Sequence, residues 1–144
     1  GLARLTRENI CGVVMKRINV VGAVIVDDGG VYCTQRGSGA LAGYWEFPGG
    51  KLEPDESPEE ALAREINEEL ACTIVVGRKV ATTTYPYDFA EVTLTTFYCA
   101  LSDGMPTLSE HSDSRWLRPE DLHLLDWAPA DVPAVHQVQR DLTR

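Results

Sequence analysis

Long apolar segments are missing from this chain of 144 residues. The longest, Val20–Val26, is far shorter than the roughly 20 residues needed to cross a bilayer, so no membrane partner is expected. The N-terminus shows no apolar core followed by a small-residue cleavage site, so secretion is not indicated. The four cysteines (Cys11, Cys33, Cys72 and Cys99) form no C-x-x-C pair, which argues against a disulfide framework or a cysteine-bound metal. We therefore expect reduced thiols and a cytoplasmic protein.

Positive charge is also scarce. The chain has 13 basic and 22 acidic residues and a formal net charge of -9. Binding a nucleic-acid polymer requires clustered Lys and Arg, so such a partner is not expected. The acidity is uneven, because residues 53–69 hold eight acidic residues and one basic residue, Arg64. A run of this kind is usually the solvated face of a helix.

Several catalytic signatures are absent from the sequence. There is no G-x-S-x-G and no Walker-type G-x4-G-K-[ST], so neither a covalent serine mechanism nor a P-loop is indicated. The three histidines, His111, His123 and His136, do not have the spacing of metal ligands. The length suits one domain. We interpret residues 1–17 as an N-terminal extension or a remnant of cloning, and residues 18–144 as a single domain.

Hydrophobic patterning predicts an α/β (α+β) fold in which helices pack against a mixed sheet. Strands are expected at about residues 18–26, 31–36, 44–47, 73–85, 92–101 and 115–117. Helices are expected at about residues 58–70 and 132–142. The first helix has a strong start signal, since Ser57 can cap it, Pro58 suits its first turn and Glu60 completes a capping box.

Three glutamates in this helix, Glu65, Glu68 and Glu69, are spaced i, i+3 and i+4 and therefore share one face. Like charges so arranged repel each other, whereas a hard divalent cation prefers carboxylate oxygens. Just upstream, Gly49-Gly50 lets the main chain approach a ligand closely. An acidic solvent-facing surface would explain any one of these features taken singly. Together they indicate metal-assisted phosphate chemistry.

Residues 50–56 and 64–72 resemble the Nudix box, G-x5-E-x7-R-E-U-x-E-E-x-G-U, and match it at every charged position. Ala71 stands where the family has Gly, which costs roughly 1 kcal/mol in a left-handed helix end. Residues 45–51 and 128–133 also resemble MutT-type nucleoside triphosphate pyrophosphohydrolases, most closely their bacterial CTP pyrophosphohydrolase branch.

This resemblance implies a Nudix-type mixed β-sheet sandwiched between helices. It also implies hydrolysis of a nucleoside triphosphate to the monophosphate and pyrophosphate with Mg²⁺, for which Mn²⁺ can substitute. Its implied metal ligands are the Gly49 carbonyl and the carboxylates of Glu65, Glu68 and Glu69, with Arg64 orienting the glutamates. Glu56 would support the metal site. The general base would be Glu65 or Glu110.

The resemblance places the substrate-binding residues elsewhere in the chain. Arg36 and Lys51 would bind phosphate, although Arg36 could equally be an exposed residue at a strand end. Asp131 would read the base edge, and as the residue before a helix it is also a natural N-cap. Aromatic residues that could stack on the base are Phe47, Tyr85, Tyr87, Phe89 and Trp127.

Three functions remain open at this stage. Pyrimidine nucleotides such as CTP or dCTP are the favoured substrates, and 8-oxo-dGTP is the alternative within the same enzyme class. A nucleotide-sensing module without catalysis is the third, which the intact set of box glutamates disfavours. The expected partner is a small nucleotide, and the expected state is a monomer or homodimer.

Overall fold

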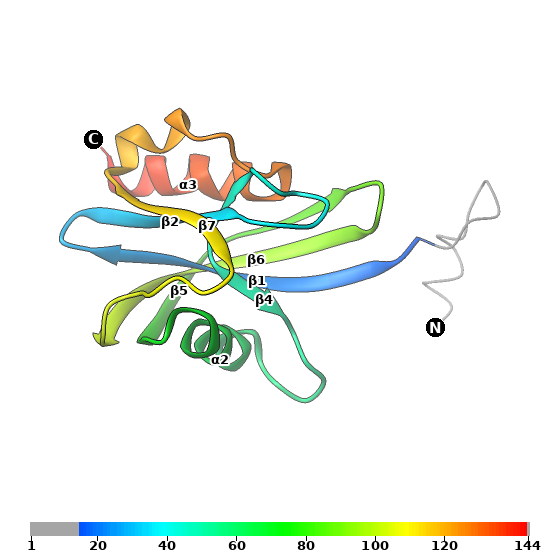
Figure 1. The fold of residues 1–144 in the computed structure, drawn as a ribbon, viewed down its shortest axis with the longest axis horizontal. Helices are drawn as coiled ribbons and strands as arrows, with labels where there is room; N and C mark the ends of the chain where they lie inside the picture. The colour runs from blue at the N-terminus through cyan, green and yellow to red at the C-terminus, as the bar shows by residue number, and fades with distance from the viewer. Residues whose placement is uncertain (1–14, 144) are drawn as a thin grey trace.

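The computed structural model describes residues 15–143, so most of the predicted N-terminal extension, residues 1–14, lies outside the described residues. The seven strands form one mixed sheet (Figure 1). They are β1 (Arg17–Asp27), β2 (Gly30–Arg36), β3 (Trp45–Glu46), β4 (Gly49–Lys51), β5 (Thr73–Pro86), β6 (Glu91–Asp103) and β7 (His111–Leu117). The helices are α2 (Pro58–Leu70), α3 (Val132–Leu142) and two 3-10 turns, η1 (Pro119–Leu124) and η2 (Pro129–Asp131).

The central strand β1 organises the sheet, whose main order is β3-β2-β1-β6-β5. It pairs with β6 in parallel, from Arg17 opposite Glu91 to Ile25 opposite Cys99, and with β2 and β4 antiparallel. Helix α2 covers one face of the sheet and α3 the other (Figure 1). The predicted mixed sheet between helices is therefore confirmed.

Two apolar clusters hold the layers together. Against α2, the fully buried Leu62 and Ile66 pack with Ile25 of β1. Against α3, Val135 and Val138 pack with side chains of β1, β2, β3 and η1. Burial of large aliphatic side chains on both faces of the sheet fixes the position of each helix. It therefore also fixes which side chains of α2 point away from the core.

Both helices span the predicted residues. The capping box of α2 is confirmed, since the Ser57 hydroxyl accepts from the Glu60 N–H and the Glu60 carboxylate accepts from the Ser57 N–H. Ala71 ends the helix in the left-handed conformation, with φ of 53°. The chain therefore keeps the geometry that glycine would favour and bears the steric cost of a Cβ there.

The six predicted strands are confirmed, five with longer bounds and β3 with shorter ones, and β4 was missed. Its sequence, Gly-Gly-Lys, has little strand propensity. A Cβ at Gly49 would overlap the carbonyl oxygen of Val21, so this approach of β4 to β1 requires glycine.

In the described part of the chain no helix is long and apolar enough to cross a membrane. Cys33, Cys72 and Cys99 are free and buried, and Cys11 lies outside the described residues.

Candidate active site

A cleft of about 610 Å³ opens between the sheet, α2 and η2. Predicted site residues that line it come from six parts of the fold: Arg36, Phe47, Gly49, Lys51, Glu65, Glu69, Tyr87, Phe89 and Asp131. Six other predicted residues do not line it, namely Glu56, Arg64, Glu68, Tyr85, Glu110 and Trp127. The cleft therefore brings an acidic end, at α2 and β4, and an aromatic end, at the β5–β6 turn and η2, into one space.

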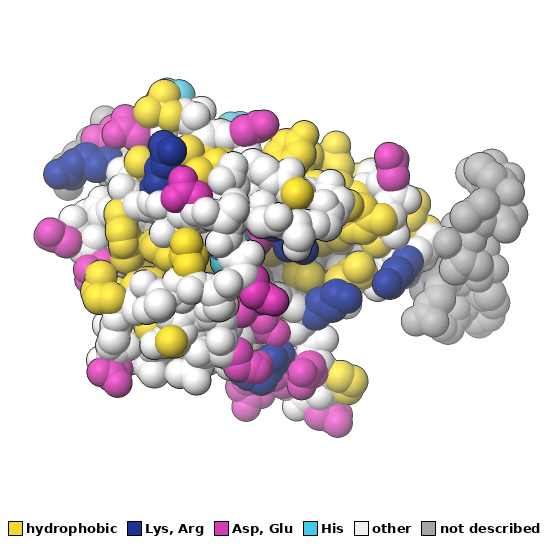
Figure 2. Space-filling view, viewed as in Figure 1, with side chains coloured by type: hydrophobic (Ala, Val, Ile, Leu, Met, Phe, Trp, Pro, Cys, Tyr) yellow, Lys and Arg dark blue, Asp and Glu magenta, His cyan; other side chains and the backbone are white. Residues whose placement is uncertain are grey.

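At the acidic end, the helix and the glycine turn are in close contact. A Cβ at Gly50 would overlap the carboxylate of Glu65, so only glycine lets this carboxylate lie over β4. Figure 2 shows acidic side chains gathered over α2 and the loop before it, with basic side chains among them. The second glycine of the pair therefore leaves room for the Glu65 carboxylate.

Arg64 connects the carboxylates of this end. Its Nη1 donates to Glu65 Oε1 at 2.9 Å and to Glu68 Oε1 at 3.0 Å. Its Nε and Nη2 donate to the two carboxylate oxygens of Glu56 at 3.0 and 2.7 Å, and Nη2 also donates to the Lys51 carbonyl at 3.3 Å. This two-point contact with Arg64 holds the pKa of Glu56 below its ordinary value. The guanidinium thus places positive charge between Glu65 and Glu68.

Glu69 is a strongly perturbed acid at the acidic end of the cleft. Burial and the charge of Glu65 raise its pKa to about 7, against a smaller opposing effect of His111. Two neighbouring carboxylates that line the same cleft suit a hard divalent cation. Within residues 15–143, however, no three acidic, His or Cys side chains already stand in a metal-binding arrangement. Glu65 and Glu69 face the cleft, and Glu68, whose side chain is 56% exposed, turns to Arg64.

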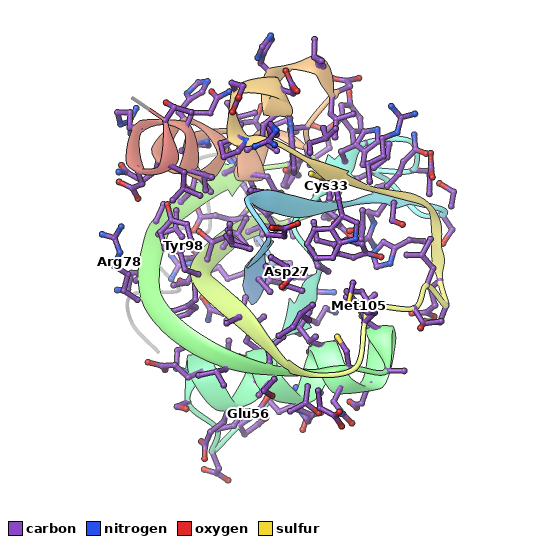
Figure 3. The ribbon with its side chains drawn as sticks, turned by 90° about the vertical axis from the view of Figure 1, so that its left-hand side faces the viewer. Asp27, Cys33, Glu56, Arg78, Tyr98 and Met105 are labelled. Carbon is purple, nitrogen blue, oxygen red and sulfur yellow. The ribbon has the colours of Figure 1, made fainter. Side chains whose placement is uncertain are left out.

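The remaining predicted acids lie outside the cleft. Glu110 is exposed in the loop before β7. Figure 3 shows Glu56 beside α2, at the opposite end of the molecule from α3. Of the two candidates for the general base, Glu65 is therefore the one that lines the cleft.

Sequence reasoning missed Glu46. Its carboxylate lines the cleft, lies 3.4 Å from Arg36 Nη1 and lies 3.3 Å from His111 Nε2. The side chain of His111 is only 8% exposed, and its Nδ1 is the buried side-chain atom without a hydrogen-bond partner among the described residues. The available signal was a charged residue between two aromatic residues, Trp45 and Phe47. Arg36 therefore ends a strand and also forms an ion pair within the cleft.

At the aromatic end, Asp131 stands at the N-cap position of α3, as predicted. Its main chain is helical, however, and its side chain makes no capping bond to α3. Instead, Oδ2 accepts from the Phe47 N–H at 3.0 Å, which ties η2 to the end of β3. Burial raises the pKa of Asp131 well above its ordinary value, with the nearby Glu46 charge adding to the effect. Asp131 therefore presents a largely buried, readily protonated carboxyl at the cleft.

The candidate stacking residues divide into two groups. Phe47 and Trp127 are 3% and 7% exposed and pack on each other, with ring centroids 4.7 Å apart. Tyr85, Tyr87 and Phe89 form a second group on the β5–β6 turn, in which the Tyr87 and Phe89 rings stack at 5.1 Å. Figure 2 shows apolar side chains gathered over this end of the hairpin. Phe89, 45% exposed, is the accessible ring of the cleft wall.

Comparisons with known proteins agree with this geometry. The NUDIX domain family matches residues 16–138. The chain is 39% identical over 120 residues to a CTP pyrophosphohydrolase of Escherichia coli K12, covering 83% of this chain and 89% of that protein. It is 29% identical over 128 residues to the 8-oxo-dGTP diphosphatase of the same bacterium, covering 88% and 99%. A solved MutT protein of the Nudix hydrolase family from methicillin-resistant Staphylococcus aureus 252 is 48% identical, with a TM-score of 0.75 over 88% of this chain and 98% of that one.

Proposed function

Because the chain belongs to the NUDIX domain family and is a Nudix hydrolase acting on nucleoside triphosphates, we propose that it cleaves cytidine triphosphates to the monophosphate and pyrophosphate with a divalent cation. The observation that carries this proposal is the single cleft lined at one end by Glu65, Glu69 and Gly49 and at the other by Asp131. That arrangement suits a ligand with a polyanionic end and a planar base.

The acidic end would hold the cation. Glu65, Glu69 and the main chain of Gly49 line the cleft, and Glu68 reaches the same group through Arg64. Mg²⁺ accepts carboxylate, carbonyl and water oxygens, and Mn²⁺ accepts the same set. A bound cation supplies charge neutralisation at the reacting phosphate. Arg64 orients Glu65 and Glu68 through hydrogen bonds from one nitrogen.

Glu65 is the proposed general base. It lines the cleft on the side of α2 that faces Gly50, whereas Glu110 is exposed in a loop outside the cleft. A base must come within hydrogen-bond reach of the attacking water. Glu110→Gln is therefore expected to lower kcat less than Glu65→Gln, and the reverse order would assign the role to Glu110.

Two of the three basic residues that line the cleft, Arg36 and Lys51, would contact the phosphates. Lys51 ends β4 beside the acidic end, and Arg36 lies further along, where it pairs with Glu46. Since the chain is strongly acidic, these side chains and the cation provide the local positive charge that a triphosphate requires.

The base would lie between Phe89 and Asp131. A carboxyl oxygen of Asp131 can accept from the exocyclic amine of cytosine, and the 39% identity to a CTP pyrophosphohydrolase supports the same preference. The raised pKa of Asp131 favours a second candidate, 8-oxo-dGTP, because a protonated carboxyl can donate to an oxidised purine.

A nucleotide panel tests the proposal. Pyrophosphate release is measured with CTP, dCTP, 8-oxo-dGTP and the common triphosphates, each with Mg²⁺ or Mn²⁺. We expect the highest kcat/KM for CTP or dCTP, and a higher value for 8-oxo-dGTP would replace the first candidate with the second. If no nucleotide in the panel releases pyrophosphate, a sensing module would be favoured.

The same samples, measured by size-exclusion chromatography with light scattering, test the prediction of a monomer or homodimer.

A matched pair of variants tests the metal end. Glu68→Gln should lower metal-dependent pyrophosphate release at least about 10-fold, the lower end of effects around a metal site. Glu59→Gln changes an exposed acid in the first turn of the same helix and should leave the rate unchanged. Equal rates in the two variants would remove Glu68 from the site.

A further inference from the structure

The hydroxyl group of Tyr87 makes a contact that a stacking residue would not need. It accepts a hydrogen bond from the main-chain N–H of Ala130 at 2.8 Å, across 43 positions of the sequence. Ala130 is 3% exposed and precedes Asp131 in the 3-10 turn η2. The early N–H groups of a helical turn have no partner within that turn, so the hydroxyl satisfies a buried donor that would otherwise be unpaired.

Tyr87 is itself firmly placed. Its main-chain N–H donates to the Ala90 carbonyl at 2.9 Å, and its carbonyl accepts from the Ala90 N–H at 3.3 Å, which closes the turn between β5 and β6. Its ring contacts Tyr85 at 4.7 Å and stacks on Phe89 at 5.1 Å. The hydroxyl therefore projects from a rigid hairpin end, and a fixed support of this kind can locate a neighbouring turn.

Asp131 is thereby held from two directions. The N–H of Phe47, the residue after β3, donates to its carboxyl group, and Tyr87 holds the preceding peptide from the β5–β6 hairpin. A third bond, from the Asp131 N–H to the Ala128 carbonyl at 2.9 Å, closes the turn itself. With the carboxyl and the main chain both fixed, the position of the base-reading group depends on the Tyr87 hydroxyl.

We propose that Tyr87 is a positioning residue for base recognition: its hydroxyl, rather than its ring face, sets η2 so that Asp131 meets the base edge. This inference rests on the proposed function of Asp131. It assigns the accessible stacking surface to Phe89, because the ring of Tyr87 is already in contact with both aromatic neighbours. Selectivity among bases should then depend on one oxygen atom that does not touch the nucleotide.

Tyr87→Phe tests this directly, because it removes that oxygen and keeps the ring. Tyr98→Phe is the matched control, since it also removes a bonded hydroxyl, one that donates to Asp141 Oδ2 at 2.6 Å. Figure 3 shows Tyr98 beneath α3, and it does not line the cleft. Both variants should lose some thermal stability. A loss of stability alone therefore does not distinguish a positioning role in base recognition from a purely structural role.

The separating measurement is the ratio of kcat/KM between the preferred and a disfavoured nucleotide, well below the melting temperature. In Tyr87→Phe we expect this ratio to fall about 3- to 10-fold through a raised KM, the size set by an ordinary hydrogen bond, with kcat within twofold. In Tyr98→Phe the ratio should be unchanged. Hydrogen exchange of the Ala130 amide should accelerate only in Tyr87→Phe.

Two results would overturn the proposal. One is an unchanged ratio in Tyr87→Phe, and the other is an equal loss on every nucleotide through kcat. If the unaltered protein hydrolyses no nucleotide, the proposed catalytic function is wrong, and the role of Tyr87 is tested separately by binding. In that event, calorimetric affinities for α,β-methylene analogues of the same nucleotides supply the ratio, with the same expected and contradicting outcomes.

Discussion

The main-chain N–H of Phe47 donates a hydrogen bond to the carboxyl group of Asp131 at 3.0 Å. Phe47 precedes the Pro48-Gly49 turn that leads to the acidic end of the cleft, and Asp131 belongs to the turn before α3. This bond couples the aromatic end of the cleft to the segment that leads into its acidic end. A change at Asp131 should therefore affect both stability and substrate choice.

Asp131→Ala and Asp131→Asn should differ in stability. Alanine leaves the buried Phe47 N–H without an acceptor, which should lower the free energy of unfolding by about 1–3 kcal/mol. Asparagine keeps an acceptor oxygen and should cost less than about 1 kcal/mol. Urea denaturation at pH 7 measures both values, and equal losses would contradict the role given to this bond.

The metal-free protein should become less stable, relative to Glu69→Gln, as the pH rises. Burial and Glu65 raise the pKa of Glu69 from 4.5 to about 7, so the folded state binds this proton more tightly than the unfolded state does. The resulting stabilisation is complete below pH 4.5 and is lost as the pH rises to about 7. Because Glu69 is partly exposed to solvent, we expect a change on the order of 1 kcal/mol.

Thermal unfolding in EDTA at pH 5 and pH 8 measures this difference, with Glu69→Gln as the reference that cannot titrate. Adding Mg²⁺ at pH 8 should restore stability to the unaltered protein more than to the variant, since a cation replaces the proton as the neutralising charge. A pH-independent difference between the two proteins would show that Glu69 is not the titrating group.

Arg64→Lys should fail to replace arginine. One guanidinium bonds Glu56, Glu65, Glu68 and the Lys51 carbonyl, and a single ammonium group cannot reproduce this planar set of donors. We expect kcat/KM to fall about 10- to 100-fold in Arg64→Lys, as for other residues that orient metal ligands. Arg78→Lys, a change at an exposed arginine beside Tyr98, serves as the control and should retain activity.

Ala71→Gly should stabilise the protein. Ala71 adopts φ of 53° at the end of α2, where an L-residue with a Cβ costs roughly 1 kcal/mol more than glycine. The thermal midpoint should therefore rise by a few degrees. Ala63→Gly, inside the same helix, should lower it by a comparable amount. A decrease in both variants would contradict the assigned cost at the helix end.

Local signals were enough to predict α2. Ser57, Pro58 and Glu60 fix its start through contacts within four residues, and Leu62, Ile66 and Leu70 mark the face that meets the sheet. The sequence alone therefore predicts that Glu65, Glu68 and Glu69 lie on this helix. Strand β4 was missed for the opposite reason, because its glycines are required by contact with Val21, which is far away in sequence.

The site contacts that sequence reasoning missed depend on distant partners. Asp131 stands at the predicted N-cap position of α3, but its carboxyl makes no capping bond and instead accepts from the Phe47 N–H, 84 positions away. Glu46 was overlooked because its partners, Arg36 and His111, come from two other strands. A pattern within a short window reports which residues share an element, but not which acceptor a side chain finds across the sheet.

The parallel pairing of β1 with β6 also has a consequence for biosynthesis. A ribosome completes β1 long before β6, so the hydrogen-bonding edge of the central strand stays open while most of the polypeptide is made. Pairings of such long sequence separation form slowly, which leaves the nascent chain exposed to association with other strands. Translation speed and chaperone supply should consequently govern the yield of this protein more than its final thermodynamic stability does.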